Sequence, residues 1–242
     1  MIERILILPD VHITQNGYSK AYALAREFTK YYKPHETVLL GDFMECEAVC
    51  HWIENKRRLV ENKRLLKEYA VANQELDWVQ KYSRRVVYLE GNHENWVEQY
   101  IDKHPEVEGL LELSTNLRLG KRGIRFVPLN NLYRKGRIHF LHGVYINKFH
   151  ALKHLTRYGC CLCYGHTHTA QTAQLNMKMM LPIMAYGLGC LCDHAPAYLK
   201  GRPSNWICQL AVMECNTKTG RFNLTPINIT DNQFIYNGKE WK

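Results

Sequence analysis

The sequence predicts an α/β protein built on two sheets, because strand-like and helix-like patterns alternate in its first part and strand-like patterns dominate later. The chain has 242 residues, enough to bury a sizeable core without disulfides or a structural metal. We find no internal repeat, low-complexity tract or linker. We therefore expect a single domain over residues 1–242, with a helical insertion at about 46–84.

Three short aliphatic or β-branched runs predict the first strands, and each run ends at a polar turn. They cover residues 5–9, 37–40 and 85–89. Apolar residues at helical spacing predict a helix over 18–32, which Pro34 stops. Each strand therefore delivers a polar residue to the loop that follows it.

The longest helical signal runs from about 51 to 82. Apart from one row of residues at heptad spacing, the faces of this segment mix basic and acidic side chains. This mixture is typical of a solvated helix with internal ion pairs, and a polyanion-binding flank is the alternative. One heptad row of this segment is apolar at first and polar later, and it comprises Trp52, Leu59, Leu66, Asn73 and Gln80.

Further along, a second helix is expected from 94 to about 104, where Pro105 interrupts it, and another over 147–158. The rest of the second half is predicted to be strands and turns. The predicted strands cover residues 124–128, 137–141, 160–164, 207–214 and 222–226.

Composition narrows the class of protein. Hydrophobic residues make up 46% and charged residues 23%, as in soluble globular proteins, and no segment is long and apolar enough to cross a bilayer. The apolar run at 5–9 is too short for a secretory signal and lacks a small-residue cleavage site. A net charge of +9 favours a polyanionic partner such as nucleic acid.

The nine cysteines are odd in number and lie in clusters, not as a framework that closes loops. This usage fits a reducing, cytoplasmic compartment. No cysteine pair with zinc-like spacing accompanies the clusters, so we expect buried small apolar residues on strands.

The residues that carry chemistry follow the ends of predicted strands. Because side chains alternate along a strand, the two members of Asp10/His12 and of His166/His168 can reach the same side just beyond a strand end. Ligands of open α/β sheets bind at the carboxyl ends of strands, where these motifs lie. The five blocks are Asp10-Val11-His12, Gly41-Asp42, Gly91-Asn92-His93-Glu94, His142-Gly143 and Gly165-His166-Thr167-His168.

This series resembles the calcineurin-like metallophosphoesterase superfamily over residues 10–168, with all five blocks in the expected order. The resemblance implies a four-layer sandwich of two mixed β-sheets flanked by helices, with two divalent metal ions at the sheet edge. Asp42 would bridge the two ions. The other implied ligands are Asp10, His12 and His168 for one metal, and Asn92, His142 and His166 for the other.

A bridging carboxylate can hold two divalent ions roughly 3.5–4 Å apart. The imidazole, carboxylate and amide donors suit manganese first, with iron, zinc or nickel as alternatives. The implied reaction is hydrolysis of a phosphoester by a metal-bridging hydroxide, with His93 beside the metals protonating the leaving oxygen. Glu94 either orients an imidazole or lies solvated in the first turn of a helix.

The second block separates the branches of the superfamily. Protein phosphatases usually extend it to G-D-x-V-D-R-G, whose arginine contacts a phosphomonoester, whereas this chain lacks the arginine and has Glu45 for the second aspartate. We therefore expect a phosphodiesterase that acts on nucleic acid or nucleotides. The alternatives are a phosphomonoesterase acting on a protein or small molecule, and a non-catalytic metal-binding interaction protein. The oligomeric state is not predicted.

Several other residues fall on no block of the family. We expect His139, His150, His154 and His194 to be structural or exposed. Residues 186–193 are expected to form a strand and a turn, with a pocket wall as the alternative. We expect most of a further set to be ordinary surface or packing residues, with stacking or phosphate contacts to a nucleotide substrate as the alternative: Tyr145, Asn147, Tyr198, Arg202 and Trp206.

Overall fold

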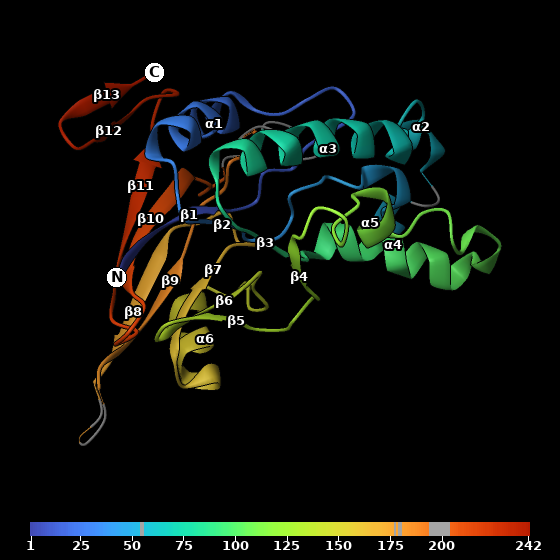
Figure 1. The fold of residues 1–242 in the computed structure, drawn as a ribbon. Coiled ribbons are helices and arrows are strands. Elements are labelled where there is room, and N and C mark those ends of the chain that lie inside the picture. Colours follow the sequence, from blue (N-terminus) through green and yellow to red (C-terminus); the bar gives the residue numbers. More distant parts are fainter. Residues whose placement is uncertain (54–55, 177, 179–180, 194–203) are drawn as a thin grey trace.

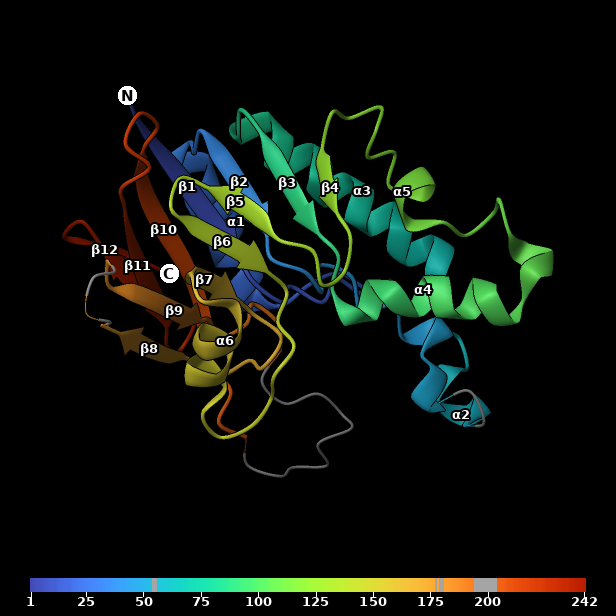
Figure 2. The same cartoon turned by 90° about the horizontal axis from the view of Figure 1, so that it is seen from below.

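The computed structural model describes residues 1–53, 56–176, 178, 181–193 and 204–242. Two sheets pack face to face, and helices cover both outer faces (Figures 1 and 2). The predicted α/β fold with four layers is therefore confirmed.

The first sheet has six strands in the order β11-β10-β1-β2-β3-β4. Strands β1 to β4 are parallel, so their carboxyl ends meet at one edge, while β10 runs antiparallel to β1 and β11 antiparallel to β10. The strands are β1 (Ile2–Leu8), β2 (Glu36–Leu39), β3 (Val86–Leu89), β4 (Arg125–Val127), β10 (Cys208–Asn216) and β11 (Phe222–Ile229).

The second sheet has five strands in the order β5-β6-β7-β9-β8, of which the central three are parallel. A separate hairpin of β12 and β13 ends the chain. These strands are β5 (Tyr133–Lys135), β6 (Ile138–Leu141), β7 (Cys161–Tyr164), β8 (Gln171–Leu175), β9 (Ile183–Gly187), β12 (Phe234–Tyr236) and β13 (Lys239–Trp241).

Three hydrophobic clusters separate the four layers. The first joins the outer face of the six-stranded sheet to α1 (Lys20–Tyr32), α3 (Leu65–Tyr82) and α4 (Asn92–Lys103). The second lies between the sheets, where residues such as Ile7 and Phe140 are fully buried. The third packs α6 (His150–Tyr158) on the five-stranded sheet. Short α2 (Arg57–Val60) and α5 (Leu113–Asn116) complete the α-helices of the described chain, with 3₁₀ turns at Glu47–Val49, His51–Ile53 and Pro105–Val107.

The prediction of one continuous helix over 51–82 is wrong in its first part. The chain there forms a 3₁₀ turn and α2, passes Asn62 at a φ of +65°, and begins α3 only at Leu65. The apolar heptad row faces solvent, because no described element covers it: Trp52, Leu59 and Leu66 are 71%, 52% and 62% exposed. The buried face of α3 instead follows the i, i+3, i+4 spacing of a helix packed on a globular core, with Leu65, Tyr69, Ala72, Leu76 and Val79.

The other predicted helices and strands have counterparts in the structure. The prediction missed β5, β8 and the β12–β13 hairpin, which are three to five residues long and lack an aliphatic run. None of the described helices combines the length and apolar character that a membrane span requires.

Candidate metal centre

Five loops bring the predicted ligands together at one edge of the sandwich. Three loops follow parallel strands of the six-stranded sheet: β1 leads to Asp10 and His12, β2 to Asp42, and β3 to Asn92 at the start of α4. The other two follow β6 and β7 of the five-stranded sheet and carry His142, His166 and His168.

Asp10, His12 and His168 form one group of the centre. His168 Nε2 lies 3.3 Å from Asp10 Oδ1 and 3.2 Å from His12 Nε2. Asp10 is fully buried, and its two carboxylate oxygens accept the backbone N–H of His166 at 2.9 and 3.0 Å. The carboxylate is therefore aimed at the imidazoles by the loop after β7.

Asn92, His142 and His166 form the second group. His142 Nε2 lies 3.0 Å from Asn92 Oδ1, and the rings of His142 and His166 are 4.9 Å apart. Asp42 belongs to both groups, because its Oδ2 is 3.2 Å from His142 Nε2 and 3.8 Å from His12 Nε2. The seven predicted ligands thus lie close together, and Asp42 Oδ2 lies between His142 and His12.

The backbone of the ligand loops is strained at the ligands themselves. Left-handed φ values between 44° and 70° occur at Asp10, His12, Asp42, His166 and His168. Such conformations are costly for residues with a Cβ, and they persist where the surrounding structure enforces them, as at functional sites. Close approach explains two of the glycines: a Cβ on Gly91 would overlap the Asp42 carboxylate, and one on Gly165 would overlap Asp10.

Glu94 holds two of these loops together. Its side chain is fully buried, so the alternative of a solvated residue is wrong, and its hydrogen bonds within the described residues go to groups other than imidazoles. Instead it accepts the backbone N–H of Asp42, Met44 and Gly91 at 2.9–3.0 Å and the hydroxyl of Tyr88 at 2.9 Å. The carboxylate therefore ties the β2 loop to the β3 loop.

Glu45 contacts two of the histidines and was not predicted to be part of the site. Its Oε2 lies 2.7 Å from His12 Nδ1 and 3.9 Å from His93 Nδ1. The Glu45 carbonyl oxygen accepts from His93 Nδ1 at 2.8 Å. This bond places the proton of a neutral His93 on Nδ1 and leaves Nε2 facing Asp42 Oδ2, 3.9 Å away.

The electrostatics of the centre favour bound cations. Asp10 and Asp42 are buried, and within the described chain their ion-pair partners are histidines, with no lysine or arginine. Burial lowers the pKa of His12, but the carboxylates of Glu45, Asp42 and Asp10 outweigh it and raise that pKa to about 10. For His142, Asp42 overcomes burial in the same way and raises the pKa to about 9.

Buried carboxylates stabilise a nearby positive charge, either as protons on the imidazoles or as divalent ions that displace those protons. The donors are nitrogen and oxygen atoms from different loops, which suits transition metals. The residues present therefore fit a two-metal site.

Cys192 is a further residue that the sequence did not single out for this site. Its Sγ lies 3.7 Å from His168 Nδ1, and it forms a possible ligand group with His12 and His168, whose ligand atoms lie within 4.8 Å of one another. Its spacing to Cys190 gave only a weak signal, since it matches no zinc motif. A soft sulfur atom thus borders the first group.

Trp206 packs against the predicted ligand His168 with ring centroids 4.3 Å apart. It therefore lies near the centre, where a residue that contacts substrate would have to be. His150 and His154 are buried on α6, and His154 bonds the backbone after His142. The predictions for His194, Tyr198 and Arg202 fall outside the described residues.

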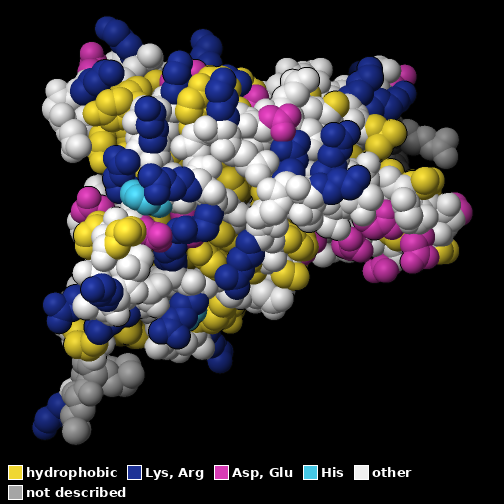
Figure 3. Space-filling model, viewed as in Figure 1, with side chains coloured by type: hydrophobic (Ala, Val, Ile, Leu, Met, Phe, Trp, Pro, Cys, Tyr) yellow, Lys and Arg dark blue, Asp and Glu magenta, His cyan; other side chains and the backbone are white. Residues whose placement is uncertain are grey.

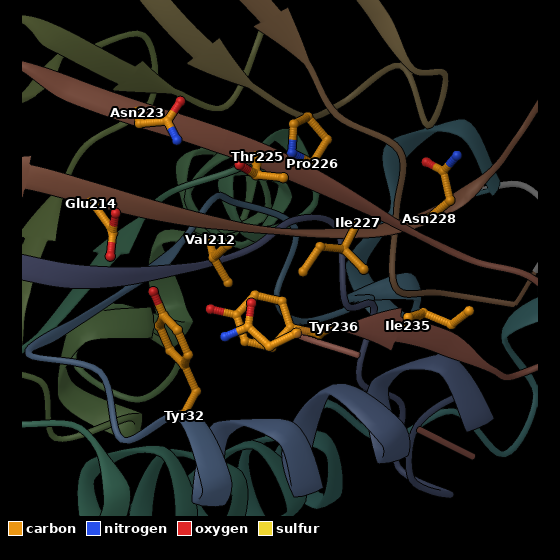
Figure 4. Close-up of a pocket in the computed structure, with 11 residues that line it drawn as sticks. Tyr32, Val212, Glu214, Asn223, Thr225, Pro226, Ile227, Asn228, Ile235 and Tyr236 are labelled. Carbon is orange, nitrogen blue, oxygen red and sulfur yellow. The ribbon is translucent and has the colours of Figure 1, made fainter. Parts of the chain in front are cut away.

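Two cavities of the described chain are lined by none of the predicted ligands. The larger, of about 540 Å³, lies between α1, β10, β11 and the β12–β13 hairpin (Figure 4). The smaller, of about 380 Å³, is lined in part by Cys192 and Cys208.

Comparison with known proteins supports one family. The model of the calcineurin-like phosphoesterase family matches residues 3–159, which is more than half of the chain. The search of curated proteins finds no match. Among solved structures, Chaetomium thermophilum Vps29 is 13% identical, with a TM-score of 0.44 and coverage of 93% of this chain and 97% of that chain. A second structure is 8% identical, with a TM-score of 0.37 and coverage of 93% and 99%.

Proposed function

Because this chain belongs to the calcineurin-like phosphoesterase family, we propose that it is a hydrolase that uses two divalent metal ions to cleave phosphodiester bonds. One observation carries the proposal: Asp42 Oδ2 faces His142 at 3.2 Å and His12 at 3.8 Å, so a single oxygen lies between the two predicted ligand groups. A structural metal site has no need of two such groups that share a carboxylate.

The first ion would be held by Asp10, His12 and His168, and the second by Asn92, His142 and His166, with Asp42 shared. Manganese is the proposed metal, with iron, zinc or nickel as alternatives. When bound, the two ions supply positive charge to the phosphoryl oxygens and activate the water that attacks phosphorus.

His93 is positioned to give a proton to the leaving oxygen. Because Nδ1 donates to the Glu45 carbonyl, Nε2 is the nitrogen directed at the centre, and the acid is the imidazolium form, in which Nε2 also carries a proton. The Trp96 ring lies 3.9 Å from the His93 ring and restricts its rotation. General acid catalysis by a histidine held in this way typically contributes about 10²–10⁴-fold to the rate.

The turn after β2 supports a diester over a monoester. Cys46 stands where the phosphatase branch has its phosphate-binding arginine, and its side chain is fully buried. The turn therefore offers no positive charge for the second negative charge of a monoester. Glu45 adds a carboxylate to the same turn, 2.7 Å from His12.

The charge of the protein supports a polyanionic substrate. The net charge is +9, and Lys and Arg side chains are spread over most of the face in Figure 3, while acidic side chains gather over α4. Long-range attraction of this kind raises the encounter rate with nucleic acid. We propose a nucleic acid or nucleotide diester as the substrate class, acted on in the cytoplasm.

A substrate panel tests the proposal. Purified protein is first stripped of metal, reloaded with manganese, and assayed on bis-p-nitrophenyl phosphate, p-nitrophenyl phosphate, single- and double-stranded DNA, RNA and cyclic nucleotides. We expect diester cleavage that chelator abolishes. Preference for the monoester would favour the phosphatase alternative, and no hydrolysis with any of the four metals would favour a non-catalytic binding protein.

A further inference from the structure

A row of aromatic rings crosses the metal centre. Trp96 lies 3.9 Å from His93, His93 lies 4.6 Å from His12, and His12 lies 5.1 Å from His168, measured between ring centroids. Trp206 continues the row beyond His168 at 4.3 Å. The two indoles therefore stand at opposite ends of a run of site histidines.

Beyond Trp96 the row reaches the protein surface. The His51 ring lies 6.2 Å from Trp96 and 4.4 Å from the ring of Trp52. His51 and Trp52 belong to the 3₁₀ turn of the helical insertion, which packs on α4. The insertion thus extends the aromatic row from the metal centre outward.

The fold does not account for the exposure of Trp52. Its side chain is 71% exposed, although its neighbour in the row, Trp96, is only 9% exposed. An indole so far in solvent contributes little buried area to stability, and tryptophan is enriched where proteins bind ligands. The face of the Trp52 indole is therefore available to a ligand of the proposed metal centre.

The surroundings of Trp52 are basic. Lys56, Arg58, Arg64 and Lys67 are exposed on the same insertion. Lys63, on the same insertion, is paired with Glu47 at 2.6 Å. Positive charge that follows a nucleic-acid backbone, together with aromatic rings that stack bases, is the combination by which proteins bind single strands.

We propose that the exposed ring of Trp52, which His51 and the buried Trp96 connect to the metal centre, is a base-stacking subsite, and that the substrate is a single-stranded nucleic acid with an unpaired base near the scissile phosphodiester. This inference rests on the proposed diesterase function. A paired base in a duplex keeps its faces against its neighbours and cannot stack on Trp52. The insertion therefore selects single strands, while the metal centre cleaves.

The test compares strands with and without a base. The substrate is an oligothymidylate whose only cleavable diester is flanked by thymines or by abasic residues. Trp52→Ala should lower kcat/KM on the thymine strand by roughly 5- to 150-fold, the range of base–aromatic stacking. The same variant should cleave the abasic strand as the unmodified protein does, and Trp52→Phe should recover most of the loss.

Leu66→Ala is the matched control, because Leu66 is 62% exposed on the same insertion but outside the aromatic row. Both side chains are largely exposed, so neither change should unfold the protein. The control should cleave both strands at the unmodified rate.

A binding assay separates this inference from the proposed function. Fluorescence anisotropy of metal-free protein measures affinity for the thymine strand, the abasic strand and a duplex without any hydrolysis. We expect Trp52→Ala to weaken only the thymine strand. An equal effect on all three strands, or no effect on any, overturns the stacking subsite even if diesters are cleaved. A selective effect with no cleavage supports the subsite and refutes the hydrolase.

Discussion

His154 offers a quantitative test of how the loop after His142 is held. The side chain is fully buried on α6, and its Nδ1 donates to the His150 carbonyl at 2.8 Å. Its Nε2 then accepts the backbone N–H of Val144 at 3.0 Å and of Tyr145 at 3.3 Å. Both nitrogens are occupied only when the imidazole is neutral.

The pKa of His154 gives the sign of the effect. Burial lowers this pKa from 6.5 to about 4. The unfolded chain therefore binds a proton between these values and the folded chain does not, so the stabilisation is present above pH 6.5 and is lost as the pH falls toward 4. At pH 5 the loss amounts to about 1–2 kcal/mol.

His154→Leu removes both the Nε2 acceptor of the two backbone N–H groups and the imidazole that takes up a proton at low pH. At pH 7.5 we expect a destabilisation of about 2–4 kcal/mol, because two backbone donors lose their partner. Between pH 7.5 and pH 5 the variant should lose about 1–2 kcal/mol less than the unmodified protein. Metal affinity should also fall, since the freed loop carries His142.

Urea unfolding of metal-free protein at the two pH values measures both effects. His104→Leu is the control, because that histidine lies at the exposed end of α4. If the His154 variant shows the same pH dependence as the unmodified protein, the neutral, loop-holding role of His154 is refuted.

The remaining predictions concern the metal centre. His93→Ala should keep both metals and lose about 10²–10⁴-fold in turnover, whereas Asp42→Ala should lose metal as well. Measuring metal content together with turnover distinguishes the two variants. Unchanged turnover of the His93 variant would remove His93 from the mechanism. Gly91→Ala should abolish tight metal binding in calorimetry, because the added Cβ displaces the Asp42 carboxylate; unchanged affinity contradicts this. Cys192→Ser should weaken zinc more than manganese in competition titrations, because sulfur is the soft donor beside His168, and equal losses would exclude that role.

The sequence predicted the site because its signals are local. An aliphatic strand followed by a polar turn is visible in any short window, and five such units in order indicated which loops carry Asp10, Asp42 and His142. Parallel strands then require that these loops share an edge. The seven predicted ligands indeed lie together, although their role as ligands is still a proposal.

Burial changed the interpretation of residues whose partners are distant in the chain. From its neighbours in the sequence, Glu94 is expected to lie in the first turn of a helix. In the structure its carboxylate also accepts a hydrogen bond from the backbone N–H of Asp42, 52 positions away. Glu45 contacts His12 across 33 positions, and Cys192 contacts His168 across 24. The spacing of apolar residues along the sequence does not indicate contacts between residues so far apart.

By itself, the sequence determined the α/β class, the strands with aliphatic runs and the loops that follow them, because strand ends and turns are set by neighbouring residues. Only the tertiary structure decided which face of the insertion is buried and which is exposed. The heptad row predicted for one helix is divided among a 3₁₀ turn, α2 and α3, and its members Trp52, Leu59 and Leu66 are exposed, whereas the buried stripe of α3 packs on the core.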